Sequence, residues 1–332
     1  MRVTPPDDRH LHTLGDQRLR NCQTDAARSS RHDGDLSTQH RFAHLSDYNS
    51  PQMHDVAIVG AGELGGALAH ILARLDVLTT VRLIDEGESV AHGQALDIML
   101  ASALQAFATR VSGSSDLATA AGAALIVVAD RPGLGEWKGE DGMAMLTRLS
   151  RIGSRSIILC AGAAQRELVE RGARELHFAR EKLFGSAPEA LAGAVRALVA
   201  LETNGSPGDV ALTILGVPPS QVVVPWEDAA IGGFAATAVL DEPARRRISA
   251  RIAPLWPPGP YSLAWAAAKA VKSAVGRSRR IVSAFVGPDD SGGRRSRAAA
   301  LPVRLGPDGI AKVVTPTLTV HDRVALENAM TL

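Results

Sequence analysis

The chain has 332 residues, of which 45% are hydrophobic and 21% charged, and its formal net charge is +1. This length exceeds one compact core but fits a two-lobed unit of enzyme size, and the composition is ordinary for a soluble globular protein. The near-zero charge gives no electrostatic reason to expect a nucleic-acid partner, so small-molecule chemistry is favoured over polyanion binding.

The cysteines and the hydropathy of the chain argue against four further classes of protein. Cys22 stands in a polar tail and Cys160 at the end of an apolar run, which disfavours a disulfide framework and a cysteine-based metal site. No apolar stretch approaches the roughly 20 residues that span a bilayer, and the N-terminus lacks the apolar core of a secretory signal. We therefore expect a cytoplasmic protein with no membrane partner and no metal.

Residues 1–52 are polar, rich in Arg, Asp, Ser and His, and show no apolar period of helix or strand, so we expect them to be disordered. Acidic residues throughout the segment argue against a mitochondrial transit peptide. Five histidines lie here, but their loose spacing makes a metal-binding tail the less favoured interpretation. Because Met53 directly precedes the first expected strand, the segment can also be interpreted as an upstream extension of a gene that begins at Met53.

From residue 55 onward, strands and helices alternate. The apolar runs predict strands over 55–60, 80–85, 124–129 and 156–160, with a short strand near residue 110. The helical patterns run from a glycine turn to about Leu75, over 91–105 and over 142–152. This alternation predicts right-handed crossovers and a mostly parallel, doubly wound α/β sheet.

The pattern changes after Gly185. Helices are expected over 188–201 and 262–275 and from about Val320, and strands over 209–215, 222–225, 280–285 and near 300–305. We therefore divide the chain into a Rossmann domain over 53–185 and a mixed α+β substrate domain over 186–332.

Residues 60–65 read G-A-G-E-L-G, a G-x-G-x-x-G that follows a strand, opens a helix and precedes Asp85 by 20 residues. Dinucleotide binding requires this arrangement, because the glycines permit a tight turn, a close approach to the pyrophosphate and close helix packing. An ordinary strand-to-helix turn with an incidental Asp is the alternative. The predicted cofactor-binding residues are Gly60, Ala61, Gly62, Glu63, Leu64, Gly65 and Asp85.

Asp85 also predicts which dinucleotide binds. Its carboxylate would accept hydrogen bonds from the adenosine ribose hydroxyls and would repel a 2′-phosphate, and residues 86–88 offer no Arg to compensate. We therefore expect NAD as the cofactor rather than NADP.

Residues 56–73 (VAIVGAGELGGALAHILA) and 83–104 (LIDEGESVAHGQALDIMLASAL) resemble the malate/lactate dehydrogenases, whose second-strand Asp leads into a helix reading G-x-A-L-D-I. Residues 302–314 and 262–275 are similar to that family's closing β-segment and long Ala-rich helix. The resemblance covers about 54–332 and is specific in the first lobe. It implies NAD-dependent chemistry on a small 2-oxo or 2-hydroxy acid, and a homo-oligomer, dimer or tetramer, with the 93–98 helix at a dimer interface.

The residues that the resemblance requires for catalysis are absent. The family's proton donor is a His in a segment H-G-D before Val-Pro, whereas residues 215–225 (LGVPPSQVVVP) place Pro218 and Pro219 there. The helix motif L-D-x-x-R-F matches 190–195, which puts Leu191 and Ala194 where an orienting Asp and a substrate Arg would stand. Ala161 and Gly162 replace the family's Asn-Pro. A slip in the alignment could bring Arg196 near the Arg position, but it restores no His.

The mobile loop of the family is kept in part, since Arg131-Pro132-Gly133 resembles its R-x-P-G. Arg131 is the candidate for binding a substrate carboxylate, and Lys138 could stand in for a second Arg without reproducing its bidentate geometry. A solvated loop is the alternative for Arg131, Trp137 and Lys138.

Other groups could supply chemistry in place of the missing set. Glu227 and Asp228 could act as acid or base, although the start of a surface helix is the more ordinary interpretation. His177 lies in a charged stretch and is better explained as a solvated side chain than as a proton donor. The run Arg277 to Arg280, with Arg294, Arg295 and Arg297, could bind an anion but is expected to face water.

Two functions remain open on the sequence. The first is an NAD-dependent oxidoreductase of malate/lactate dehydrogenase type with an altered substrate or proton donor. The second is a catalytically silent NAD(H)-binding relative that acts as a sensor or a partner-binding subunit. The glycine turn and Asp85 fit both equally.

Overall fold

The structure, a computed structural model, describes residues 54–331 except positions 154, 277 and 290–295. These described residues form one compact unit. The extension expected to be disordered, residues 1–52, lies outside the described residues, as do Arg277, Arg294 and Arg295 of the basic run.

Six parallel strands form the first half of the sheet, as the alternating pattern predicted. They lie in the order β8-β7-β4-β1-β2-β3, in which β2 and β3 follow on one side of β1, and β4, β7 and β8 on the other. Their bounds are β1 Asp55–Val59, β2 Thr80–Ile84, β3 Arg110–Ser114, β4 Leu125–Val128, β7 Ile157–Cys160 and β8 Leu183–Gly185. This strand order is that of a Rossmann sheet, so the predicted α/β fold is confirmed.

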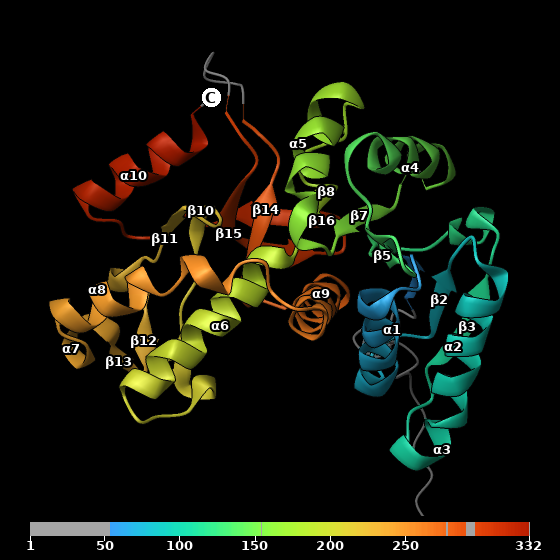
Figure 1. The fold of residues 1–332 in the computed structure, drawn as a ribbon, viewed down its shortest axis with the longest axis horizontal. Helices are drawn as coiled ribbons and strands as arrows, with labels where there is room; N and C mark the ends of the chain where they lie inside the picture. Colours follow the sequence, from blue (N-terminus) through green and yellow to red (C-terminus); the bar gives the residue numbers. More distant parts are fainter. Residues whose placement is uncertain (1–53, 154, 277, 290–295, 332) are drawn as a thin grey trace, which may run out of the picture. The chain divides into compact units, whose positions relative to one another are not determined.

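Helices cover both faces of these strands (Figure 1). Their bounds are α1 Glu63–Leu75, α2 Glu88–Leu100, α3 Ser102–Gln105, α4 Gly139–Ile152 and α5 Arg166–Glu175. The helix predicted over 91–105 begins earlier and is interrupted at Ala101, which ends α2 and precedes α3. The short strand β8 and the helix α5 had no expected counterpart, because α5 is strongly charged and β8 has only three residues.

The second half adds antiparallel strands to the same sheet. Beyond β8 lie β14 Ile281–Val286, β15 Ala299–Gly306, β10 Leu215–Val217 and β11 Gln221–Val223, and β16 Gly309–Val313 pairs with β15. The prediction of one strand over 209–215 is wrong in one respect, because the chain forms two strands there. These are β9 Val210–Ala211, which lies in a separate small sheet, and β10. The chain turns between them, where the Ile214 N–H donates to the Ser283 hydroxyl at 3.0 Å.

The two long helices of the second half lie beside α1 of the first half. Helices α6 Ala187–Glu202 and α9 Pro260–Val275 contact each other, and α9 also packs on α1, so the three lie in a row (Figure 1). Two small helices, α7 Ala236–Val239 and α8 Glu242–Ala250, lie beyond α6, and α10 Val320–Met330 closes the chain. The second half is therefore the mixed α+β arrangement that was expected.

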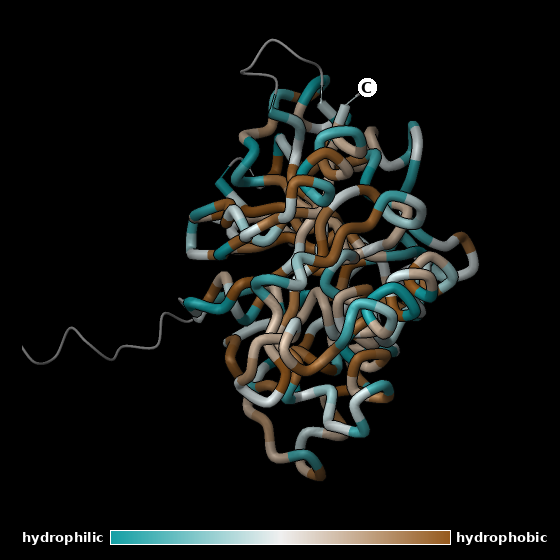
Figure 2. Tube along the Cα trace, turned by 90° about the vertical axis from the view of Figure 1, so that its left-hand side faces the viewer, coloured by the Kyte–Doolittle hydropathy of each residue, from teal (hydrophilic) through white to brown (hydrophobic). Residues whose placement is uncertain are grey.

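A hydrophobic core runs through the sheet and holds the two halves together. Figure 2 shows hydrophobic segments through the middle of the molecule, where the strands lie. The largest cluster includes residues from β1, β4 and β7 as well as α9 and β14, so it crosses residue 185. The division into domains at this residue stays a prediction. Within the described part of the chain, no helix is both long and apolar enough to cross a membrane.

Candidate functional site

The glycine turn after β1 has a geometry that only glycine permits at two positions. Gly60 has a φ of +108°, and its N–H donates to the Ile84 carbonyl of β2 at 2.7 Å. A Cβ at Gly65 would overlap the Gly60 carbonyl oxygen. The turn therefore needs these glycines to bring α1 close to β1, whatever ligand the protein binds.

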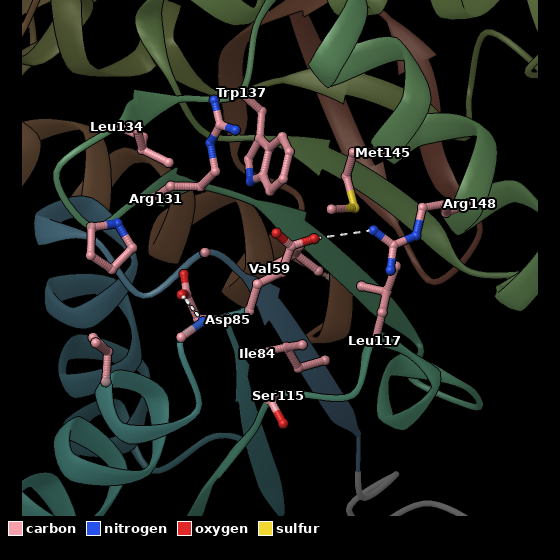
Figure 3. Close-up of a pocket in the computed structure, with 15 residues that line it drawn as sticks. Val59, Ile84, Asp85, Ser115, Leu117, Arg131, Leu134, Trp137, Met145 and Arg148 are labelled. Atoms are coloured by element: carbon pink, nitrogen blue, oxygen red, sulfur yellow. Dashed lines mark hydrogen bonds and ion pairs between the residues drawn. The ribbon is translucent and has the colours of Figure 1, made fainter.

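Asp85 follows β2 and lies directly against this turn. Its side chain lies at the edge of the pocket drawn in Figure 3 and is 8% exposed. Its carboxylate accepts the Ala61 N–H and the Gly87 N–H, each at 2.9 Å. The carboxylate thus joins the turn after β1 to the turn after β2. The structure brings Asp85 and the predicted glycine turn together, as the sequence spacing required.

A pocket of about 220 Å³ opens beside Asp85 at the carboxyl ends of β1 and β2. Figure 3 shows Trp137 and Arg131 on one side of it and Met145 and Arg148 of α4 on another. Arg148 donates to Glu86 at 3.2 Å across the rim. The pocket has the position and the partly apolar lining expected for a nucleoside.

Arg131 is not part of a solvated loop. Its guanidinium lies over the Trp137 ring, 4.1 Å from the ring centroid, and 3.6 Å from Asp141. Trp137 is 6% exposed, so the aromatic half of this cation–π pair is buried. The Arg131 Nε and the Trp137 Nε1 are buried without a hydrogen-bond partner among the described residues. Lys138, by contrast, is exposed at the start of α4.

Asp130 is a site residue that the sequence analysis missed. Its carboxylate accepts the Leu64 N–H at 3.1 Å and the Gly65 N–H at 2.9 Å, in the first turn of α1. Its carbonyl oxygen accepts the Gly62 N–H at 2.9 Å, and a Cβ at Gly62 would overlap the carboxylate. The open space above the glycine turn therefore holds a protein anion. One signal was present, since Asp130 comes two residues after the end of β4, which neighbours β1.

Glu136 makes a corresponding contact six residues later. Its carboxylate accepts the Ala163 N–H at 2.9 Å and the Ala164 N–H at 2.7 Å, at the turn after β7. Burial, and secondarily the nearby negative charge of Glu136, raise the pKa of the Cys160 thiol to about 12. Cys160 is therefore a neutral core residue and not a nucleophile.

Two of the positions matched to the family's catalytic residues are buried. Leu191 is fully buried in a cluster with Ile214 and Val224, which flank the β10–β11 hairpin. Pro218 is buried in the hairpin turn, and Pro219 is exposed. The place expected for a His–Asp pair is thus filled by hydrophobic contacts.

Arg196 lies with a buried acid rather than with Arg131. Glu189 is 4% exposed and accepts from the Arg196 guanidinium at 2.9 Å, the Lys269 ammonium at 2.5 Å and the Ser283 N–H at 2.8 Å. Arg196 also donates to the Leu212 carbonyl. These contacts join α6, α9 and β14, so the cluster serves the packing of the second half.

The remaining candidates for acid–base chemistry are not brought to the pocket beside Asp85. Glu227 and His177 are exposed, and Asp228 accepts the Thr317 N–H at 2.8 Å in a separate cavity that Arg196 and Lys269 line. No group of three or more His, Cys, Asp or Glu side chains in the described part of the chain could hold a metal ion.

Comparisons with known proteins give a consistent result. No family model matches the chain. It is 27% identical to the malate dehydrogenase of Thioalkalivibrio sulfidiphilus over 296 residues, which cover 84% of this chain and 96% of that protein. It is 25% identical to the malate dehydrogenase of Rhodopirellula baltica over 297 residues, 83% of this chain and 93% of that protein.

Solved structures share the fold at lower identity. The malate dehydrogenase of Salinibacter ruber aligns with a TM-score of 0.71 and 21% identity, over 83% of this chain and 93% of that one. The lactate dehydrogenase of Cryptosporidium parvum, solved with lactic acid and nicotinamide adenine dinucleotide, aligns with a TM-score of 0.73 and 16% identity, over 84% and 95%. By its sequence relatives the chain is similar to the malate dehydrogenases, and it shares the fold of the malate and lactate dehydrogenases.

Proposed function

We propose that the chain is an NAD(H)-linked oxidoreductase of malate/lactate dehydrogenase type whose catalytic set has diverged. The observation that carries this proposal is the pocket at the carboxyl ends of β1 and β2, with Asp85 and the glycine turn at its edge. The named activity of the relatives, and the cofactor in one of the solved structures, support the same class. Bound NAD(H) would supply the hydride.

The fit of NAD(H) to this site differs between two parts of the cofactor. The adenosine part fits, because the pocket is partly apolar and Asp85 lies where a ribose would need acceptors. The pyrophosphate bridge does not fit the site as folded, because the Asp130 carboxylate already accepts the N–H groups of Leu64 and Gly65.

Substrate chemistry at this site would be slow. Reduction of a 2-oxo acid leaves an alkoxide that needs a proton, and a missing general acid costs a rate factor of roughly 10²–10⁴. Leu191 and Pro218 are buried apolar residues, and Glu227 and Asp228 lie elsewhere. Arg131 remains the candidate for attracting a 2-oxo or 2-hydroxy acid.

The burial of Leu191 and Pro218 favours the second function, a silent NAD(H)-binding relative that acts as a sensor or a subunit. Stopped-flow oxidation of NADH with oxaloacetate or pyruvate separates the two. We expect turnover below about 1 s⁻¹, the low end of ordinary enzyme rates, and weaker association of the acid in Arg131→Ala. Faster turnover would establish the oxidoreductase and require another proton donor.

The choice of cofactor is tested by calorimetric titration with NADH and NADPH. We expect NADH to bind more tightly, since Asp85 would repel a 2′-phosphate, and Asp85→Ser to narrow the ratio of the two affinities. The ratio of the two affinities is the quantity to compare, because Asp85 also accepts the N–H groups of Ala61 and Gly87. Its loss would loosen the turn and so weaken the binding of both ligands. Equal affinities in the parent protein would remove this role from Asp85.

We also propose a homo-oligomer. Leu96, Leu100 and Leu104 are exposed at intervals of four along α2 and α3, which places large apolar side chains along one side of this segment. Helix α2 contains residues 93–98, which the resemblance to the malate/lactate dehydrogenases places at a dimer interface. Light scattering after size-exclusion chromatography should give a multiple of the chain mass, and Leu96→Glu with Leu100→Glu should give the monomer.

A further inference from the structure

The segment from Asp130 to Glu136 is a small β-hairpin whose two ends carry carboxylates. Strand β5, Asp130–Arg131, pairs antiparallel with β6, Gly135–Glu136, and Asp130 lies directly opposite Glu136. Asp130 accepts two N–H groups at the start of α1, and Glu136 accepts two at the turn after β7. One hairpin therefore binds the segments that follow two strands of the parallel sheet.

The groups that Asp130 uses are those that a pyrophosphate would need. The first N–H groups of a helix have no partner within it, and together with the helix dipole they favour an anion. Gly62 leaves open the space that a phosphate would enter, and the Asp130 carboxylate fills it, because a Cβ at Gly62 would overlap this carboxylate. Two anions at such a short distance would repel each other strongly, so they cannot share the site.

The two ends of the hairpin, Asp130 and Glu136, are held by hydrogen bonds, while its tip is exposed. The Gly62 N–H donates to the Asp130 carbonyl, and Arg131 lies over the buried ring of Trp137. Leu134 at the tip is 69% exposed. These contacts do not involve the wall of the pocket formed by Ile84, Asp85 and Val90, which stays open.

We infer that this hairpin occupies the pyrophosphate site, so that the pocket beside Asp85 takes an uncharged nucleoside of the adenosine type in preference to a dinucleotide. A dinucleotide binds only when Asp130 leaves the start of α1. Asp130 is thus the residue that determines which ligand class the pocket accepts. The inference rests on the proposed function in one respect, that the turn over residues 60–65 is the place where the pyrophosphate of NAD(H) would bind.

Calorimetric titration with adenosine and with NADH tests this directly. The parent protein should bind adenosine more tightly than NADH. Asp130→Asn removes the charge and keeps the shape, so NADH should bind at least about tenfold more tightly, a change of about 1.4 kcal/mol, while adenosine changes by less than about twofold. Asp130→Ala should act in the same direction, and Glu136→Gln, which releases only the other end of the hairpin, should give a smaller gain.

Asp241→Asn is the matched control. Asp241 also accepts a helix N–H, that of Ala244 at 2.8 Å at the start of α8, and it lines none of the pockets described above. Its substitution should leave both affinities unchanged. Near-ultraviolet circular dichroism of each variant checks that the fold is kept, and the two Asp130 variants and Glu136→Gln provide independent tests.

Two results would overturn the inference, and they differ in what they say of the proposed function. If the parent binds NADH more tightly than adenosine and the Asp130 variants show no gain, the hairpin does not exclude the pyrophosphate, and the NAD(H)-linked function stands. If neither the parent nor any variant binds NADH or adenosine, the pocket beside Asp85 is not a nucleotide site, and the proposed function fails together with the inference.

Discussion

The glycine turn after β1 and the β10–β11 hairpin differ in how closely their residues match the motifs of the malate/lactate dehydrogenases. The glycines of the turn are all present, whereas two of the positions matched to the family's catalytic residues hold buried apolar side chains, Leu191 in α6 and Pro218 in the hairpin. The reason lies in what each residue does for the fold. Gly60 and Gly65 are needed because a Cβ at either position would overlap backbone atoms. A catalytic His or Asp, by contrast, can be replaced by an apolar side chain that packs against its neighbours.

This difference limits what a glycine motif proves. A Cβ at Gly65 would overlap the Gly60 carbonyl oxygen, so Gly65 is required by the contact of α1 with β1 even when no ligand is bound. Asp85 likewise has a structural role, because it accepts N–H groups from both turns. The motif therefore predicts the Rossmann fold more securely than it predicts the cofactor.

The largest effect is expected at Gly65, where the structural need for a glycine can be tested without any ligand. Gly65→Ala should lower the free energy of unfolding by about 3 kcal/mol or more without any ligand, because its neighbour is rigid backbone. Gly193→Ala in α6 is the control, since its Cβ would meet nothing within 4 Å and should stabilise the protein by about 0.5–1 kcal/mol. Urea denaturation measures both. A small loss at Gly65 would mean that ligand binding alone requires the motif.

The charged cluster of the second half should be the next most sensitive. Glu189→Gln leaves Arg196 and Lys269 without their carboxylate in a mostly buried place and should cost about 2 kcal/mol. Glu202→Gln, which breaks a more exposed pair with Arg247, should cost below about 1 kcal/mol. Equal losses in urea denaturation would show that Glu189 does not hold α6, α9 and β14 together.

Cys160 gives the fold a dependence on alkaline pH. Its pKa is raised from the ordinary 9.0 to about 12 in the folded protein, so above pH 9 the unfolded chain loses a proton that the folded chain keeps. Stability should therefore fall by about 1.4 kcal/mol for each pH unit between pH 9 and pH 12. Because other groups titrate there, the slope is compared with that of Cys160→Ala. Identical slopes would contradict the assignment of Cys160 as a buried thiol.

Asp76 should show the smallest effect and the opposite sign. Hydrogen bonds from the backbone N–H groups of Ala108 and Thr109 lower the pKa of this carboxyl below its ordinary 3.8. Its stabilisation is present above pH 3.8 and is lost as the pH falls further. Asn readily adopts the left-handed backbone conformation of this position. Asp76→Asn should therefore lower the free energy of unfolding by less than about 1 kcal/mol at pH 7, since the carboxyl group is exposed. Thermal melts at pH 7 and pH 3 should show that the difference becomes smaller at the lower pH.

Much of the first half could be predicted from the sequence because its signals are local. The run Asp55 to Gly60 gives a strand and a turn, and the spacing to Asp85 places a carboxylate beside that turn. The contacts of Asp130 could not be predicted in this way. It meets backbone 65 and 66 residues earlier in the chain, and that meeting depends on how the hairpin folds over the sheet.

The second half was harder to predict for a different physical reason. A strand was expected over 209–215, but the chain turns after β9 because Ile214 bonds to Ser283, 69 residues later. Glu189 stands in an Ala-rich helix with nothing nearby in the sequence to mark its partners, and Lys269 is 80 residues away. Such contacts are set by helix packing and leave no periodic signal.

The placement of Arg131 over Trp137 gives the molecule an optical reporter of its own. Indole emission depends on the charge and the water around the ring, and here a guanidinium lies 4.1 Å from the ring centroid while the ring is shielded from solvent. Any ligand that displaces the hairpin must separate this pair or expose the ring. In a variant that keeps Trp137 and replaces the other three tryptophans with Phe, a shift in the emission spectrum would follow the position of the hairpin in real time, with no added label.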